Sequence, residues 1–324
     1  MSADLTEAPL ISFTVFISAF IFLLKSADFF VDGAAGLADK LGLPRIFIGI
    51  VLMGFLTTSP EFAVSVQAAY LGHPEVALGN AVGSVVADDA FALALAAIIA
   101  GISIDKQVLK RFGVFLIFSA LLSYLLALDA SVTRVEGLVL ASLLVGYYLY
   151  LIKTGAQQRK SHLNTEGYVE ARKVTFRRVL LLFLTGAGGV IVSARLVVWS
   201  GLSIAEYFGI PEVVIGLTVI ALGTSLPEIS TAVVSARKGK GEIAVGNILG
   251  ADVLNILWII GVSALVNPIK VDPKTIEFAY PWMLLVVAVM LLLMRHRYEL
   301  TRWKGLLLLS LYVVYLFQLA KFFY

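Results

Sequence analysis

The sequence predicts an all-α polytopic membrane protein in which ten transmembrane helices form two inverted repeats of five, with helices 2 and 7 broken. Three observations predict this fold class. The 324 residues are 60% hydrophobic, and their mean hydropathy is +0.94, whereas soluble domains are only about half apolar. The apolar residues gather in long segments. One block of motifs occurs twice.

Ten apolar segments are long enough to cross a hydrocarbon core of about 30 Å, which needs about 20 helical residues. They cover residues 10–39, 44–71, 76–101, 111–129, 133–153, 178–208, 211–236, 241–267, 276–295 and 302–323. The polar interval 154–177 is too short for a folded domain, which needs about 50 residues or more. We therefore expect a first repeat over residues 1–153, a linker over 154–177 and a second repeat over 178–324.

The repeated block comprises a proline-glutamate motif and a glycine-asparagine motif. The first copy is Thr57-Thr58-Ser59-Pro60-Glu61 with Gly79-Asn80-Ala81-Val82-Gly83, and the second is Thr224-Ser225-Leu226-Pro227-Glu228 with Gly246-Asn247-Ile248-Leu249-Gly250. The shift in residue number that carries Glu61 onto Glu228, which we call the repeat offset, aligns the copies without a gap. With this offset, 15 of the 45 residues in 44–88 match their partners. This agreement indicates an internal duplication.

An odd number of spans in each half makes the second copy enter the membrane from the opposite face, as in many secondary transporters. The distribution of basic residues agrees, because 19 of the 25 Lys and Arg residues lie in loops that should share one side. By the positive-inside rule that side is cytoplasmic. We expect a multi-pass protein of the cell membrane with both termini outside and the linker in the cytoplasm.

Each repeat places a carboxylate directly after a proline inside an apolar span. A charge at this depth costs at least a few kcal/mol, and proline breaks the helix, which leaves free carbonyl groups that can bind cations. Thr57 and Thr224 lie one turn before Glu61 and Glu228, on the same helix face. Because Na+ and Ca2+ prefer oxygen ligands, the sequence predicts a cation site at mid-membrane.

The third span of each half adds further polar groups. Ser84 and Asp88 are four residues apart and share a face, and the repeat offset pairs them with Ala251 and Asn255. Asp89 lies about 100° away around the helix, so we expect it to face something else. The glycines of the Gly-Asn motifs should permit close helix packing.

The first span of each half also carries charges, which we expect to snorkel or to pair at the membrane rim rather than to join the site. They are Lys25, Asp28, Asp32 and Asp39 in the first half and Arg195 and Glu206 in the second.

These motifs resemble those of the calcium/cation antiporter superfamily, and the chain looks like a short prokaryotic Na+/Ca2+ exchanger. The resemblance covers nearly the whole chain and is most specific at residues 223–228 and 246–250. It implies that the main ion ligands are Glu61, Glu228, Thr57 and Thr224. It also implies five secondary ligands, which are Thr58, Ser225, Ser84, Asp88 and Asn255.

Three departures from the family pattern matter. Leu56 and Ser59 replace a glycine and a leucine, which should change packing only. Ala251 replaces a serine, which removes a hydroxyl from the site. The acid of the third-span pair is Asp88, whereas several relatives carry it at the place of Asn255. The resemblance associates an aspartate there with K+, so its absence argues against K+ dependence.

The expected function is secondary active antiport of Ca2+ for Na+ by alternating access, and exchange of H+ for Ca2+ or another divalent cation is the alternative. A channel would need the same acids but no coupling. An enzyme is not expected, because His73, His162 and His296 lie in loops without metal-ligand spacing. The expected partners are Ca2+, Na+ and the lipid bilayer, with no cofactor and no nucleic acid, and we expect a monomer.

Overall fold

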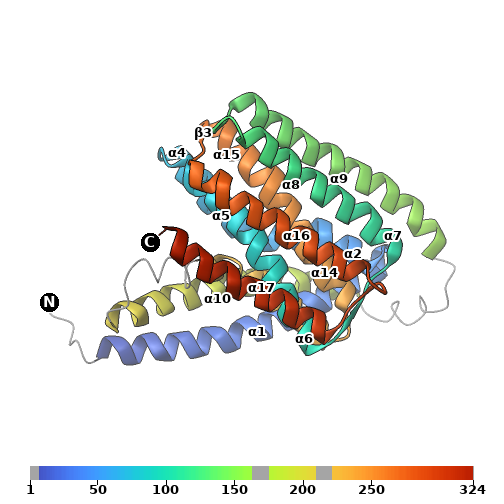
Figure 1. Cartoon of the computed structure of the whole chain (residues 1–324). Coiled ribbons are helices and arrows are strands. Elements are labelled where there is room, and N and C mark those ends of the chain that lie inside the picture. Colours follow the sequence, from blue (N-terminus) through green and yellow to red (C-terminus); the bar gives the residue numbers. More distant parts are fainter. Residues whose placement is uncertain (1–6, 163–174, 209–220, 324) are drawn as a thin grey trace.

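The computed structural model describes residues 7–162, 175–208 and 221–323, and Figure 1 shows them as a bundle of long helices. The helices of the first half are α1 (Glu7–Leu41), α2 (Arg45–Ile48), α3 (Gly54–Thr57), α4 (Ser59–Tyr70), α5 (Pro74–Ala87), α6 (Leu93–Ile99), α7 (Lys106–Val108), α8 (Val114–Ala127) and α9 (Arg134–His162). Those that follow are α10 (Phe176–Tyr207), α12 (Ala221–Thr224), α13 (Leu226–Arg237), α14 (Gly241–Val253), α15 (Ile260–Val266), α16 (Tyr280–Arg295) and α17 (Arg302–Phe323).

Short π-helical segments, in which the helix accommodates one extra residue per turn, continue several of these helices. They are η1 (Gly49–Met53), η2 (Asp88–Ala92), η3 (Leu109–Gly113), η7 (Leu254–Ile259) and η8 (Thr275–Ala279).

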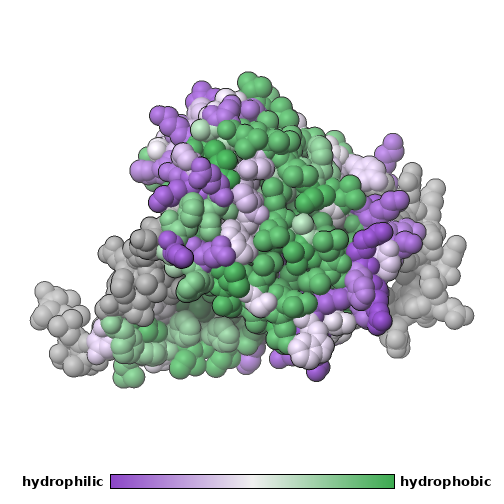
Figure 2. All heavy atoms as spheres, viewed as in Figure 1, coloured by the Kyte–Doolittle hydropathy of each residue, from purple (hydrophilic) through white to green (hydrophobic). Residues whose placement is uncertain are grey.

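The fold is helical and membrane-spanning, as the sequence predicts. In the described residues, eight helices are long and apolar enough to cross a bilayer, and a bent pair over Arg45–Thr57 and Ser59–Tyr70 makes up to nine. The remaining expected span, 211–236, falls partly on residues 209–220, outside the described part, so the count of ten stays a prediction. Figure 2 shows apolar side chains over the flank of the bundle and polar ones toward its ends.

The spans that carry the two Gly-Asn motifs lie at the centre of the molecule. The most apolar window of Pro74–Ile99 is 72% buried and that of Gly241–Val266 is 83% buried, against 22–39% for the other single spans. Gly246 and Gly250 of α14 pack against the backbone of the second span at Ile46 and Ile50. A side chain at either glycine would collide with this backbone, so the expected close packing is confirmed for the second motif.

Helices α1 and α10 lie side by side along one flank of the bundle (Figure 1). Gly33 of α1 packs on the backbone of Phe183, and Gly186 of α10 packs on the backbone of Phe30. Because the residue numbers rise along one helix as they fall along the other, the two helices are antiparallel. Their glycines bring the backbones into direct contact.

Two small antiparallel strand pairs join loops from different halves of the chain. Strand β1 (Ile102–Ser103) pairs with β4 (Glu299–Leu300), and β2 (Ser131–Val132) pairs with β3 (Ile269–Lys270). Local structure recurs at the repeat offset, which carries Ile102 of β1 onto Ile269 of β3 and η2 onto η7. The conformation of the helix end recurs too, since Ala100 has φ −146° and Asn267 has φ −145°.

A candidate cation site at two helix breaks

The second span is broken as predicted, with a bend of 44° between its two parts. The break falls at Thr58, between α3 and α4, and Pro60 lies in the first turn of α4. In the other copy α12 ends at Thr224 and α13 begins at Leu226, with Pro227 in its first turn. The sequence placed the helix breaks at Pro60 and Pro227, so each predicted break was two residues too far toward the C-terminus. A proline fits the first turn because that N–H would be unpaired anyway.

Ser59 gives a physical reason for one departure from the family pattern. Pro60 has no N–H, so the carbonyl of Leu56 loses its usual helical donor. The Ser59 hydroxyl donates to that carbonyl at 2.7 Å. Leu226, which occupies the equivalent position, has no hydroxyl. The two breaks therefore differ in how their carbonyl groups are satisfied.

The two glutamates follow the breaks and are each only 1% exposed. Glu61 lies in the first turn of α4 and Glu228 in the first turn of α13. The Thr58 hydroxyl donates to Oε1 of Glu228 at 3.1 Å, which joins the break of one half to the acid of the other. One oxygen of each carboxylate, Oε2, has no hydrogen-bond partner among the described residues. A buried unpartnered carboxylate oxygen is costly, and a cation would satisfy it.

Asp88 brings a third carboxylate to the same region. It begins η2 and is 1% exposed, and in the described part of the chain both its oxygens lack a hydrogen-bond partner. The charges of Asp88, Glu61 and Glu228 all interact with one another. The Ser225 hydroxyl lies beside the Asp88 carboxylate. The structure thus brings together the three acids that the sequence predicts.

Asn247 of the second Gly-Asn motif links the two halves through hydrogen bonds. Its Oδ1 accepts from the Thr57 hydroxyl at 3.1 Å. Its Nδ2 donates to the Thr231 hydroxyl at 2.8 Å, and Thr231 donates in turn to the carbonyl of Pro227 at 2.8 Å. Thr57 therefore keeps oxygen lone pairs free for an ion while its proton is engaged. The sequence treats Asn247 only as part of a packing motif, so this role was missed.

The remaining predicted ligands lie less directly at the carboxylates. Ser84 and Asn255 are 3% and 1% exposed, and in the described contacts neither forms a hydrogen bond to the three acids. Thr224 is half-buried at the end of α12. Among the described residues, no three Asp, Glu or His side chains form a ready metal-binding cluster. Hydroxyl and carbonyl groups would therefore have to share the coordination.

A second acid pair, Asp89 and Asp252, was not predicted to belong together. Both side chains are fully buried, and none of their four oxygens has a hydrogen-bond partner within the residues that the structure describes. They interact mainly with each other, and Asp252 also interacts electrostatically with Asp88 and Glu228. Asp89 therefore has Asp252 as its partner, and its charge also interacts with that of Asp88 in the main site. The sequence feature that could have identified Asp252 as the partner of Asp89 is an acid inside the apolar eighth span with no basic residue near it.

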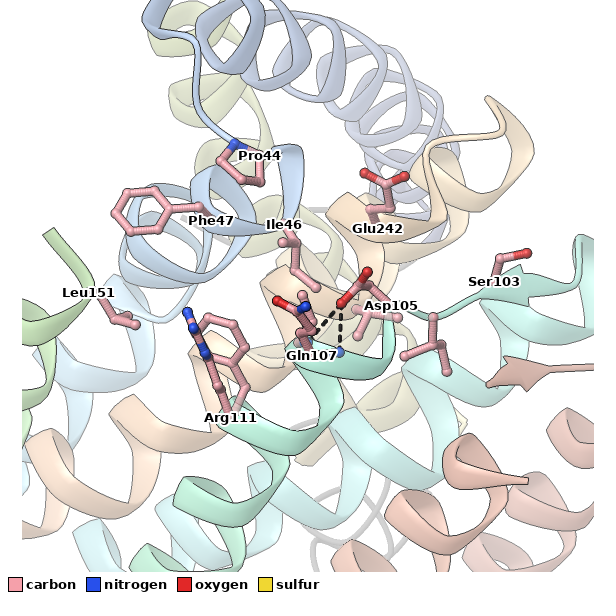
Figure 3. A pocket seen from close by; sticks show the side chains of 13 residues that line it. Pro44, Ile46, Phe47, Ser103, Asp105, Gln107, Arg111, Leu151 and Glu242 are labelled. Carbon is pink, nitrogen blue, oxygen red and sulfur yellow. Dashed lines mark hydrogen bonds between the residues drawn. The ribbon is translucent and has the colours of Figure 1, made fainter. Parts of the chain in front are cut away.

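A cavity of about 480 Å³ lies away from these acids, at the beginning of α14 (Figure 3). Apolar side chains line much of it, and Asp105, Gln107, Arg111 and Glu242 supply polar groups. Asp105 is engaged in capping α7, because its Oδ1 accepts from the backbone N–H groups of Gln107 and Val108 at 2.7 and 3.0 Å. The cavity contains none of the predicted ligands.

A buried set of carboxylates and hydroxyls at breaks in membrane-spanning helices is the arrangement of an ion transporter. The chain belongs to the sodium/calcium exchanger protein family, whose family model matches residues 11–153 and 178–320. The repeat offset that aligns the motifs also carries both ends of the first matched segment onto the ends of the second. Residues 154–177 fall between them.

Curated relatives and solved structures agree with this family. The chain is 28% identical to the sodium/calcium exchanger MaX1 of Methanosarcina acetivorans, over 94% of this chain and 97% of the relative. It is 33% identical to the inner membrane protein YrbG of Escherichia coli, over 96% and 97%. A structure of the sodium-calcium exchanger NCX_Mj soaked without Na+ and Ca2+ matches with a TM-score of 0.83 and 26% identity, over 96% of this chain and 99% of that one.

Proposed function

We propose that this protein is a secondary active antiporter that exchanges Ca2+ for Na+ by alternating access at the buried carboxylates. The observation that carries the proposal is the burial of Glu61, Glu228 and Asp88 within range of one another's charge, with four carboxylate oxygens that have no hydrogen-bond partner among the described residues. Together they provide a charge near −3, which one Ca2+ or about three Na+ would largely neutralise. Binding of one ion type then excludes the other.

In this proposal Glu61, Glu228, Thr57 and Thr224 are the main ligands. Thr58 and Ser225 assist them, since their hydroxyls lie beside Glu228 and Asp88. Ser84, Asp88 and Asn255 complete the site from the third and eighth spans. Coordination by six to eight oxygens is typical of Ca2+, and two breaks facing each other could supply that number.

We further propose that the two matched segments are inverted five-helix repeats, with both termini extracellular and the linker cytoplasmic. The recurrence of η2 as η7 and of β1 as β3 supports the duplication. The strand pairs also support inversion, because each joins loops that the basic residues assign to the same side.

The decisive experiment is uptake of radioactive Ca2+ into proteoliposomes driven by an outward Na+ gradient. Breaking a buried charge arrangement typically costs about 3–5 kcal/mol, so Glu61→Gln and Glu228→Gln should each reduce uptake by about 100-fold or more. Glu75→Gln is the matched control, because Glu75 also lies in the first turn of a helix but pairs at the surface with His73. Retained uptake in both site variants would refute the site.

Exchange of Ca2+ for H+ is the alternative to exchange for Na+, and the same vesicles distinguish the two. In a second set of vesicles the interior is more acidic than the medium, so that the proton gradient is directed outward. No Na+ gradient is imposed, and the solutions are otherwise the same. We expect Ca2+ accumulation with Na+ and none with H+ alone. Accumulation driven by the pH gradient alone would make the protein a H+/Ca2+ exchanger.

A further inference from the structure

Helices α1 and α10 pack as a unit that is distinct from the main core. Their buried apolar side chains, among them Leu23, Phe30, Val179 and Phe183, form most of a second cluster, to which the second span, α13 and α14 contribute Ile48, Met53, Val234 and Ile243. The main apolar cluster instead joins the central spans to α8, α9, α16 and α17. A pair of helices packed mainly on each other can slide along its neighbours without opening that core.

A network of ion pairs fastens this unit to the turn between α13 and α14. Asp32 of α1 lies 2.7 Å from Nζ of Lys240 and 2.9 Å from Nζ of Lys238. Asp28 lies 3.3 Å from Nζ of Lys238 and 3.4 Å from Arg237, and its carbonyl accepts from Lys238 at 2.9 Å. Lys238 and Lys240 are only 23% and 20% exposed, so these pairs are screened less than free surface pairs.

We propose that these five residues form a latch that holds the α1–α10 unit in one position during the exchange cycle, and so are positioning residues for transport. The inference rests on the proposed alternating-access function. A slide of α1 by one helical turn, about 5.4 Å, would separate Asp32 from both lysines. The basic turn lies on the side that the positive-inside rule makes cytoplasmic, so the latch acts at the cytoplasmic face.

The latch has no counterpart at the other end of the molecule. The repeat offset carries Asp28 and Asp32 onto Arg195 and Trp199. It carries the basic turn back onto Tyr70-Leu71-Gly72-His73, where His73 pairs locally with Glu75. Among the described residues no ion pair joins α10 to that turn. The network therefore breaks the symmetry of the duplicated fold and favours the conformation in which these ion pairs form.

Spin-label distances test the latch without any requirement for transport. The chain contains no cysteine, so labels attach only at Ile21→Cys on α1 and Lys110→Cys on the main core, both exposed positions. We expect one dominant distance in the otherwise unchanged protein and a second population, several-fold larger, after Asp28→Asn with Asp32→Asn. Asp39→Asn is the control, since Asp39 is an acid of α1 that pairs with Arg45 instead.

Charge-reversal variants distinguish a latch from a merely structural role. Asp32→Lys should enlarge the second population, and adding Lys240→Asp should reverse most of that change. In vesicles, Asp28→Asn with Asp32→Asn should change the apparent KM for Ca2+ about threefold in opposite directions on the two faces. Unchanged distances in the charge variants would overturn the latch even if exchange is normal, whereas altered distances in a protein that exchanges no ions would refute only the proposed function.

Discussion

Asn247 shows how single residues hold the candidate site together by hydrogen bonds rather than by charge. It is fully buried and bridges Thr57 of one half to Thr231 of the other. Removing one partner of a buried hydrogen bond costs about 1–3 kcal/mol, because the other group stays unsatisfied. This amide therefore helps to hold the Thr57 hydroxyl, which also lies 3.1 Å from the Met53 carbonyl and 3.3 Å from the Gly54 carbonyl.

We expect Asn247→Ala to lower the free energy of unfolding by about 1–3 kcal/mol and to weaken Ca2+ binding, because Thr57 loses an acceptor that joins it to the other half. Thermal unfolding in detergent and the KM for Ca2+ uptake measure the two effects. Asn80→Ala is the comparison, because Asn80 is only partly buried and, among the described residues, makes one hydrogen bond, to Ser65 at 3.0 Å. An equal loss in both variants would contradict the bridging role.

At the residue scale the sequence was sufficient for the acids but not for their partners. Glu61, Glu228 and Asp88 were predictable because a carboxylate in an apolar span is costly wherever it points. The bridging role of Asn247 and the pairing of Asp89 with Asp252 depend on how separate spans rotate against each other. That rotation comes from packing between helices far apart in the chain, which a single helix pattern does not contain.

At the scale of elements, glycines decide which helices touch. Gly33 and Gly186 let α1 and α10 meet backbone to backbone, and Gly246 and Gly250 do the same for α14 and the second span. The second contact follows from a recognisable motif spacing. The first was not predicted, because the glycines of the first and sixth spans show no repeated motif. The charges of α1 were predicted to pair at the rim, and Asp28, Asp32 and Asp39 do pair.

Gly186→Leu should push α1 away from α10, because any side chain there meets the backbone of Phe30. Overpacking typically costs about 1–3 kcal/mol, so we expect lower thermal stability and slower exchange. Gly188→Leu provides the control, since this glycine is exposed and faces open space. Thermal unfolding and initial uptake rates measure both. Equal behaviour of the two variants would mean that the helices are not in close contact in the bilayer.

At the scale of the whole molecule, the helix breaks and the duplication were readable from the sequence, since proline and the repeat offset mark them directly. The asymmetry between the halves was predictable only in part. Ser59 was recognised as a departure from the family pattern, but its hydrogen bond to the Leu56 carbonyl was not predicted. The charged network around Lys238, which among the described residues exists at one end only, depends on contacts between α1 and the turn after α13 that the motifs do not contain.

The charge of the whole site leads to a prediction about membrane voltage. If Glu61, Glu228 and Asp88 accept one Ca2+ or about three Na+, each cycle moves about one net charge, which is worth about 2.3 kcal/mol at 100 mV. The equilibrium ratio of Ca2+ across the vesicle should then change about 50-fold for 100 mV.

Asp88→Asn leaves a charge near −2, which one Ca2+ or about two Na+ satisfy, so the effect of voltage should vanish. Vesicles clamped with K+ and valinomycin measure this ratio, with Glu75→Gln as the control. Full voltage dependence in the Asp88 variant would show that Asp88 does not set the number of Na+ ions.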